Sequence, residues 1–573
     1  MPRLNNLDSL RLFLVNLRST SLYLLLGILN LSILVPQASL DPDPHHDGVM
    51  FAAAAAVAEG KVPNRDVFAQ YGPLAPIIHG QILKIFGVQL LNLRLATAVM
   101  LVSTALILFA LLRSQVGFKT AFLVQLLWVV SYPKLPLPPL MPWASVICTL
   151  LLLASWSCWK IASNSHANLF KIRFLYFLSG LTISLAIFVR IQMLFFVLLL
   201  VVFILYKSYF RDPLFTQSQY FVLGCSILIL GFVIWMSNNG SLGDFIEQCI
   251  TWPREFYGTA YLPTTIFTKD GFIYWSTWYY YPFFFFLAFI LVRLSKKYQG
   301  MFNLRNRRYG YALWTTTTIL AIALSFLGTF EVNPKSYLNP VLQLQWLIEK
   351  VPLSLFYFLA ALGFIKIVSF LLSGQRSFGV FEITIVGAAI AQLYPGSDPI
   401  HLWWIAPILM VAIIPNMYKD KINSENMRSM FNFLLIFFLL FSVVNLGQLH
   451  SKDRVYFGKN TVLSGMQSPI DESRFIGRSI ELLTQYSTSN QISFDCADGL
   501  YATAGGSYLP VDKYFVNWGP ARNPTKRDFS IIFICRTGYN EMLLKYPPNQ
   551  FEVLHEIRSL SGMENYILAT KSP

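Results

Sequence analysis

Three aspartates and two adjacent histidines stand close together near the start of the chain, in the stretch LDPDPHHDG. These residues are Asp41, Asp43, Asp47, His45 and His46. A carboxylate at a helix N-terminus is stabilised in its ionised form, and such a group can serve as a general base. Asp47 directly precedes an alanine-rich helical segment, so it is the first candidate, with Asp43 and then Asp41 as substitutes. A solvated loop at a helix exit is the alternative interpretation.

Two arginines complement these carboxylates as possible anion ligands. Arg190 stands in the apolar stretch SLAIFVRIQMLFF, and Arg94 stands at the start of another apolar run. A guanidinium matches a phosphate through two parallel hydrogen bonds, so both arginines are candidate phosphate ligands. Arg190 at a hairpin turn, with its charged end reaching the membrane interface, is the competing interpretation.

A turn followed by an apolar helix forms a third candidate region, QLYPGSDPIHLWWIAP. Asp398 and His401 lie at the start of that helix. His401 and its neighbours could bind a phosphate or a sugar at the external face of the membrane. Alternatively, Asp398 caps the helix and His401 is an interface residue.

The elements that must position these residues are predominantly apolar helices. The chain has 573 residues, of which 55% are hydrophobic and 13% charged, whereas soluble domains carry about 25% charged residues. Runs of about 20 apolar residues predict transmembrane helices. We therefore predict a polytopic α-helical membrane protein with about 13 spans, at residues 20–38, 90–112, 118–132, 141–159, 174–190, 191–207, 218–237, 277–294, 311–329, 351–372, 378–394, 401–416 and 430–447.

The net charge of +15 is explained by topology. With a cytoplasmic N-terminus held by a retained signal anchor, the basic clusters fall in cytoplasmic loops and most acidic residues fall outside, as the positive-inside rule requires. The basic charge therefore needs no nucleic-acid partner. An odd number of spans places the C-terminus outside, and the location expected is a plasma or inner cell membrane.

Three parts follow one another along the chain. Residues 1–449 form the transmembrane region, and within it the first external loop, 39–89, carries helical segments at Val49–Glu59 and Ala75–Phe86. Residues 450–573 are predicted to form an extracytoplasmic α/β domain. Its helix and strands are expected at Ser473–Tyr486, Gln491–Cys496, Ser530–Cys535, Phe551–Ile557 and Asn565–Thr570.

The sequence lacks the motifs of zinc sites and of nucleotide-dependent enzymes. The chain has six cysteines without a CxxC pair, so no zinc site of that kind is expected. Cys496 and Cys535 in the external tail could form a disulfide, or could be two separate thiols. A P-loop, a Rossmann glycine fingerprint, HExxH and GxSxG are all missing in the required context, which leaves nucleotide-driven chemistry unsupported.

The order of these parts resembles the GT-C superfamily of membrane glycosyltransferases. The stretches that carry the resemblance are DPDPHHDG, AEGKVPNRDVFAQYGPL, GLTISLAIFVRIQ and YPGSDPIHLWWIAP, together with the α/β tail. The resemblance covers the whole chain in architecture and about 60 positions in specific residues. Many relatives carry Asp-Glu in the first loop, where this chain has His46-Asp47.

The resemblance implies an enzyme that transfers a sugar from a polyprenyl-phosphate donor to an acceptor hydroxyl outside the membrane, usually with inversion. A first-loop carboxylate would be the base, and Arg190, His401, Arg94 and Asp398 would hold the donor phosphate. Residues expected to line the substrate are His46, Asp66, Tyr71, Arg254 and Tyr257. The acceptor would be a glycan, a lipid or a protein.

Some relatives use a divalent metal ion and others do not. Adjacent side chains such as His45 and His46 cannot easily share one ion, so we predict no metal site, and a divalent ion at these histidines stays an alternative. Two further functions also stay open, a polymerase or ligase of lipid-linked oligosaccharides and a transporter of a lipid-linked sugar. A transporter would show internal repeats and charges at the membrane midplane, and the sequence has neither feature.

Overall fold

The computed structural model describes most of the N-terminal half and parts of the C-terminal half. The described residues are 6–132, 140–164, 168–210, 217–251, 379–392, 399–419, 453–459, 461–487, 492–494, 499–504, 531–535, 551–560 and 562–570, with short pieces between 253 and 446. The chain divides into two compact units. Unit 1 comprises residues 1–114, 134–251 and 451–573, and unit 2 comprises residues 115–133 and 252–450.

Long apolar helices form one part of unit 1. They are α1 (Asn6–Ala38), α4 (Leu90–Val116), α6 (Ala144–Asn164), α7 (Leu169–Val189), α8 (Leu194–Tyr209) and α10 (Gln219–Asn238). In the described part of the chain, six helical segments are long and apolar enough to cross a membrane. The expected spans at 277–294 and 311–329 lie outside the described residues, so the total of about 13 stays a prediction.

Two glycines allow α7 and α10 to approach closely. A Cβ atom at Gly180 would collide with the carbonyl oxygen of Phe221, and one at Gly224 would collide with the carbonyl oxygen of Phe177. Small residues at helix contacts permit such close backbone packing in membranes. At its other end α7 stops at Val189, and a short 3₁₀ turn, η1 (Ile191–Met193), leads into α8. The sequence-based break between these two spans is therefore present.

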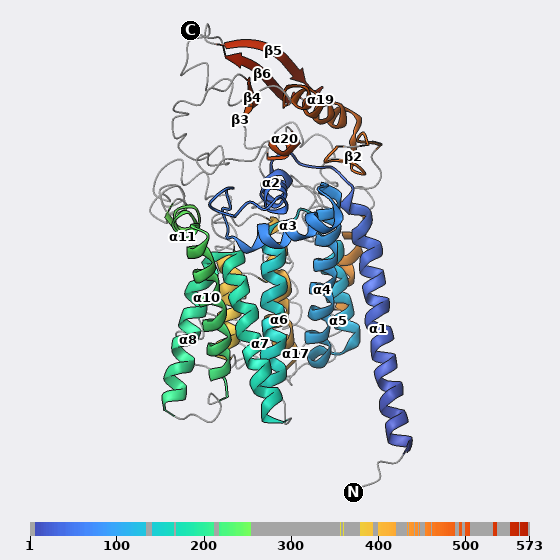
Figure 1. Cartoon of the computed structure of the whole chain (residues 1–573). Helices are drawn as coiled ribbons and strands as arrows, with labels where there is room; N and C mark the ends of the chain where they lie inside the picture. Colours follow the sequence, from blue (N-terminus) through green and yellow to red (C-terminus); the bar gives the residue numbers. More distant parts are fainter. Residues whose placement is uncertain are drawn as a thin grey trace, which may run out of the picture. The chain divides into compact units, whose positions relative to one another are not determined.

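Two shorter helices, α2 (His46–Ala58) and α3 (Leu74–Phe86), follow α1 and lie at one end of the long helices (Figure 1). The alanine run of α2 has high helix propensity, and its residues from Asp47 to Val57 are buried apart from Val49. A helix that is apolar on all sides needs such an environment. Both helices occur where the sequence predicts them. Later in unit 1, two short helical segments follow α10: α11 (Leu242–Ile246) and η2 (Glu247–Thr251).

The tail of unit 1 contains two small sheets. Strands β1 (Arg454–Tyr456) and β2 (Gln467–Pro469) pair antiparallel. The second sheet has the order β3-β4-β6-β5, with β3 parallel to β4 and the other pairs antiparallel. Its elements are β3 (Ile492–Phe494), β4 (Ile531–Cys535), β5 (Phe551–Arg558) and β6 (Glu564–Thr570), accompanied by α19 (Ile470–Ser487) and α20 (Gly499–Ala504).

Helix α19 and strands β3, β4, β5 and β6 occur where the sequence predicts them, whereas β1, β2 and α20 were not predicted. Contacts group the tail in one unit with residues 1–114 and 134–251, and the domain boundary at residue 449 stays a prediction. Cys496 lies outside the described residues, so its bridge to Cys535 stays a prediction as well.

The described part of unit 2 consists of α5 (Phe118–Val130), α16 (Val380–Ala391) and α17 (Pro399–Lys419). Two buried tryptophans join α5 to α17, with ring centroids 4.8 Å apart. The indole Nε1 of Trp128 donates to the carbonyl of Trp403 at 2.9 Å, and that of Trp403 donates to the carbonyl of Trp128 at 2.8 Å. These reciprocal hydrogen bonds satisfy both buried indoles, as buried polar groups require.

Candidate active site

The three aspartates between α1 and α2 have three different environments. Asp41 forms a bidentate ion pair with Arg454 of β1, in which Nε and Nη2 each lie 2.8 Å from a carboxylate oxygen. Its backbone has a φ of 46°, a conformation that aspartate tolerates better than most residues. Its amide donates to the carbonyl of Gln467 at 2.8 Å. Asp41 therefore links the loop to the tail.

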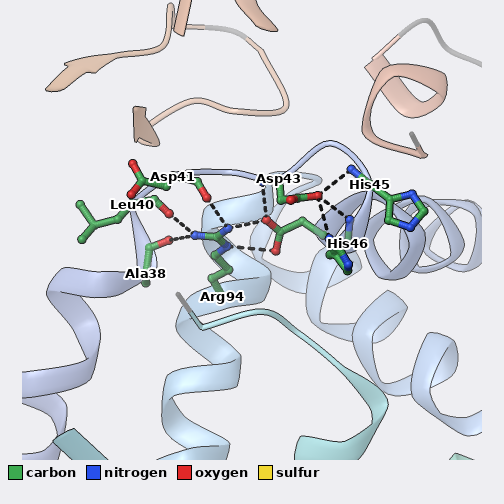
Figure 2. Close-up of polar contacts among 8 residues, drawn as sticks. Ala38, Leu40, Asp41, Asp43, His45, His46 and Arg94 are labelled. Carbon is green, nitrogen blue, oxygen red and sulfur yellow. Dashed lines mark hydrogen bonds and ion pairs between the residues drawn. The ribbon is translucent and has the colours of Figure 1, made fainter. Parts of the chain in front are cut away.

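Asp47 is fully buried in the first turn of α2 and pairs with Arg94, which is also fully buried. Arg94 Nε donates to Asp47 Oδ1 at 3.2 Å, and Nη2 donates to Asp47 Oδ2. The remaining N–H groups point to three backbone carbonyls, of Ala38, Leu40 and Asp41. Figure 2 shows the guanidinium of Arg94 enclosed by these groups.

Burial and ion pairing shift the pKa of the Asp47 carboxyl in opposite directions. Burial raises the pKa of its carboxyl above the ordinary value, while the Arg94 guanidinium and the amide of Asp43 oppose that rise. From the sequence, Asp47 is predicted to transfer a proton and Arg94 to bind a donor phosphate. In the structure, these two charges face each other.

Asp43 is the third carboxylate, and its side chain keeps 27% of its surface exposed. Its Oδ1 accepts the backbone N–H groups of His45 at 2.9 Å and His46 at 2.6 Å. The Nδ1 atom of His46 lies 3.2 Å from the same oxygen. Burial alone would raise the pKa of Asp43, but His46 brings it below the ordinary value, with a smaller effect from His45. Within the described residues, its Oδ2 accepts no hydrogen bond.

Aromatic rings lead from this carboxylate to a buried arginine. The ring of His46 lies 6.3 Å from that of Trp143, which in turn lies 5.3 Å from the ring of Tyr71. The guanidinium of Arg190 lies 4.8 Å from the Tyr71 ring centroid, and its Nη1 donates to Ser145 Oγ. Asp43, His46, Trp143, Tyr71, Arg190 and Ser145 thus form one cluster, which we call the Asp43–Arg190 cluster.

Backbone geometry places Tyr71 beside Arg190. Gly72 has a φ of 153°, and a Cβ atom there would collide with the carbonyl oxygen of Phe188. Glycine therefore allows the loop to reach the end of α7, where the amide of Ile191 donates to the carbonyl of Tyr71 at 3.3 Å. Arg190 itself is extended, with φ −145° and ψ 104°.

The loop between α2 and α3 is fixed by its own polar contacts. Asn64 Nδ2 donates to Gln248 Oε1 at 2.9 Å, and Gln248 Nε2 donates to the carbonyl of Asn64 at 2.7 Å. Asp66, predicted to line the substrate, instead pairs with the neighbouring Arg65 at 2.9 Å and accepts the amide of Val62 at 2.8 Å. These contacts hold the segment that carries Tyr71.

The remaining predicted site residues belong to unit 2 or lie outside the described residues. His401 belongs to unit 2, in the first turn of α17, with its ring 5.1 Å from that of Trp404. Asp398, Arg254 and Tyr257 lie outside the described residues. Among the described residues, no three His, Cys, Asp or Glu side chains are grouped as a metal site would need.

Sequence reasoning missed three residues of this region: Trp143, Ser145 and Arg454. Trp143 and Ser145 stand at the start of an expected span, where an aromatic residue is ordinary. Arg454 contacts Asp41 across 413 positions of sequence. No local pattern signals a contact of that range.

Comparisons with known proteins give a loose structural similarity. No family model matches the chain, and no curated protein matches it. ArnT from Cupriavidus metallidurans in the apo state is 12% identical, with 96% of this chain and 98% of that chain covered at a TM-score of 0.42. The same protein bound to undecaprenyl phosphate is also 12% identical, with 96% and 97% covered at a TM-score of 0.41. Similarity at this level does not assign the chain to a family.

Proposed function

We propose that this chain is a membrane glycosyltransferase that moves a sugar from a polyprenyl-phosphate donor to an acceptor hydroxyl. The observation that carries the proposal is the Asp43–Arg190 cluster. It holds a partly exposed carboxylate at one end, a buried guanidinium at the other, and the rings of Trp143 and Tyr71 between them. Each part suits the reaction of a sugar phosphate. The phosphate pairs with the cation, the apolar face of the sugar packs on the aromatic rings, and the carboxylate accepts the proton of the acceptor hydroxyl.

Asp43 is the base in this proposal. Asp41 is paired with Arg454 and Asp47 with Arg94, whereas Asp43 Oδ2 accepts no hydrogen bond from the described residues. A general base must come within hydrogen-bond reach of the proton that it accepts. Partial exposure gives Asp43 that access, and its lowered pKa keeps it ionised.

The reaction is a single displacement with inversion. Asp43 accepts the proton of the acceptor hydroxyl while the acceptor oxygen forms a bond to the anomeric carbon. The bond from that carbon to the phosphate oxygen breaks, and the lipid phosphate leaves with the electron pair. Arg190 stabilises the negative charge that grows on this oxygen, a contribution that preorganised cations make in sites shielded from water.

The donor class follows from two further features. The cluster lies at the ends of helices that are long and apolar enough to cross a membrane, so a donor with a lipid tail could approach from the bilayer. The sequence stretches around Asp43, Tyr71 and Arg190 are those that resemble the GT-C superfamily. The proposed location is accordingly a cell membrane, and no nucleotide enters the reaction.

Purified protein in nanodiscs tests the proposal with a panel of undecaprenyl-phosphate-linked hexoses and pentoses and an envelope extract as acceptor. We expect sugar transfer and release of undecaprenyl phosphate from at least one donor, and a large decrease of both, to a measurable residual rate, in Asp43→Asn. Asp453→Asn is the matched control, because Asp453 is an exposed tail aspartate outside the cluster.

Other outcomes separate the alternatives. Transfer only from pyrophosphate-linked oligosaccharides would make the chain a polymerase or ligase. Movement of an intact lipid-linked sugar across the bilayer without bond cleavage would make it a transporter. Full activity in Asp43→Asn would remove Asp43 from the mechanism.

A further inference from the structure

We propose that Arg94 and Asp47 are positioning residues for Asp43, and that Asp41 and Arg454 extend this function into the tail. The inference rests on the proposed function of Asp43. The contacts run in one chain, Arg454–Asp41–Arg94–Asp47–Asp43, which we call the Arg–Asp chain. Positioning Asp43 would be the function of these charged residues, which do not themselves take part in the proposed reaction.

Arg94 is saturated by the loop that surrounds it. A guanidinium has five N–H groups, and the described contacts of Arg94 are the two carboxylate oxygens of Asp47 and the carbonyls of Ala38, Leu40 and Asp41. Binding a phosphate would require the loss of one or more of these contacts in a fully buried position. The geometry instead fits a residue whose hydrogen bonds hold the segment 38–47 in one conformation.

Asp47 connects Arg94 to the backbone of Asp43. Its Oδ2 accepts the backbone amide of Asp43 at 2.9 Å, while Arg94 binds both carboxylate oxygens. Asp47 therefore fixes the backbone from which the Asp43 side chain extends. A displacement of about 1 Å in a reacting group can reduce a rate by about 100-fold.

The outer end of the Arg–Asp chain lies in strand β1. Arg454 is 4% exposed and binds both carboxylate oxygens of Asp41. The carbonyl of Asp41 then accepts from Arg94 Nη2 at 3.1 Å. A second contact supports the same connection, because the amide of Gln467 donates to the carbonyl of Ser39 at 2.7 Å. Residues of the tail thus influence the position of Asp43 without touching it.

Stability alone is a weak reason for such a pair. Removing two charges from water is costly, and apolar residues of similar volume often replace a buried ion pair without loss of stability. The directional hydrogen bonds of Arg94, in contrast, fix the positions of four groups at once, the Asp47 carboxylate and the carbonyls of Ala38, Leu40 and Asp41. A buried ion pair next to a reactive carboxylate is therefore better explained by the conformation that it enforces.

Arg94→Lys tests the inference, because lysine keeps the charge but has only three donors on a single nitrogen. With the best donor of the undecaprenyl-phosphate panel, we expect kcat to fall by about 10- to 100-fold while KM for the donor changes by less than about threefold. Arg113→Lys is the matched control, since Arg113 lies in the last turn of the same helix. A large rise in KM at unchanged kcat would make Arg94 a donor ligand and overturn the inference.

A double-mutant comparison shows whether Arg94 acts through Asp43. In the Asp43→Asn background, Arg94→Lys should reduce the residual rate by less than about twofold, because a positioning residue has no effect once its target is gone. Arg454→Gln should reduce kcat by a smaller factor in the same direction, and it keeps the test possible if Arg94→Lys does not fold. Equal losses in both backgrounds, or full activity in both arginine variants, would overturn the inference.

Hydrogen exchange separates this inference from the proposed function. We expect faster amide exchange in peptides covering residues 38–47 of Arg94→Lys and Arg454→Gln, with no change in Arg113→Lys. If the wild-type protein transfers no sugar but the two variants still exchange faster than it does, the Arg–Asp chain is preserved and only the proposed function is contradicted. Unchanged exchange would overturn the chain even in an active enzyme.

Discussion

The guanidinium of Arg190 lies 4.8 Å from the ring centroid of Tyr71, and the two residues come from segments far apart in the sequence. Tyr71 reaches this position because Gly72 permits contact with the end of α7. A flat guanidinium stacks on an aromatic ring and still directs N–H groups outward in its own plane. The tyrosine therefore orients the cation that we propose for the donor phosphate.

Arg190→Lys should raise KM for the donor by about 10-fold or more, because lysine keeps the charge but loses the planar stack and the bidentate geometry. Donor titrations in nanodiscs measure this effect. Arg173→Lys is a matched control, since Arg173 lies in α7, which ends directly before Arg190, and also lies over a tyrosine ring, 5.3 Å from that of Tyr220. An unchanged KM in Arg190→Lys, or equal changes in both variants, would contradict the assignment.

The pH dependence of kcat/KM tests the environment of Asp43. His46 lowers the pKa of Asp43 below its ordinary value of 3.8, so the wild-type activity should fall only when the pH drops below that value. His46→Gln removes the imidazole and its charge but keeps the backbone amide that Asp43 accepts, so the acidic limb should move to higher pH. His45→Gln should move it less, because His45 has the smaller effect on Asp43. An acidic limb at the same pH in all three proteins would contradict Asp43 as the base.

The same shift has a consequence for stability. A carboxyl whose pKa is lower in the folded protein than in the unfolded chain stabilises the fold above the unfolded-state pKa, and this contribution is lost as the pH falls through the folded-state value. The contribution of Asp43 should therefore be smaller in His46→Gln. Thermal unfolding measured at neutral and acidic pH should show a smaller difference between the two conditions in that variant.

Much of the local structure could be predicted from the sequence. The alanine run predicts α2, the apolar periodicity predicts α3 and the tail strands, and the charged break at Arg190 predicts the end of α7. These features depend on propensity and on short-range patterns, which a single sequence contains. Asp43, His46, Tyr71 and Arg190 could also be selected, because charged and aromatic residues near apolar runs are conspicuous.

The pairing of charges could not be predicted in the same way. Both Asp47 and Arg94 stand out in the sequence as reactive groups, yet the structure pairs them with each other and places Asp43 against His46. The Asp47–Arg94 and Asp41–Arg454 ion pairs join residues brought together by tertiary packing, and spacing along the chain does not determine which carboxylate meets which arginine. The close contact of Gly48 with Gly499 has the same long-range origin.

Gly224→Ala tests the packing of α7 against α10. The added methyl group would collide with the carbonyl oxygen of Phe177, and overpacking of this kind typically costs about 1–3 kcal/mol. Gly231→Ala on the same helix has open space around the new methyl group and should leave the thermal unfolding temperature unchanged or slightly higher. Equal unfolding temperatures of the two variants in detergent would contradict this close contact.

Gly48→Ala tests the contact between α2 and the tail. A Cβ atom at Gly48 would collide with the amide nitrogen of Leu500 and lie 2.9 Å from that of Gly499, so the two helices would have to separate. Because Gly48 immediately follows Asp47, we expect a lower unfolding temperature together with slower sugar transfer. Gly477→Ala in α19 is the matched control, since a Cβ atom there meets nothing within 4 Å and alanine favours a helix by about 0.5–1 kcal/mol over glycine. Normal transfer by Gly48→Ala would show that α20 can move away from α2 without disturbing the acidic loop.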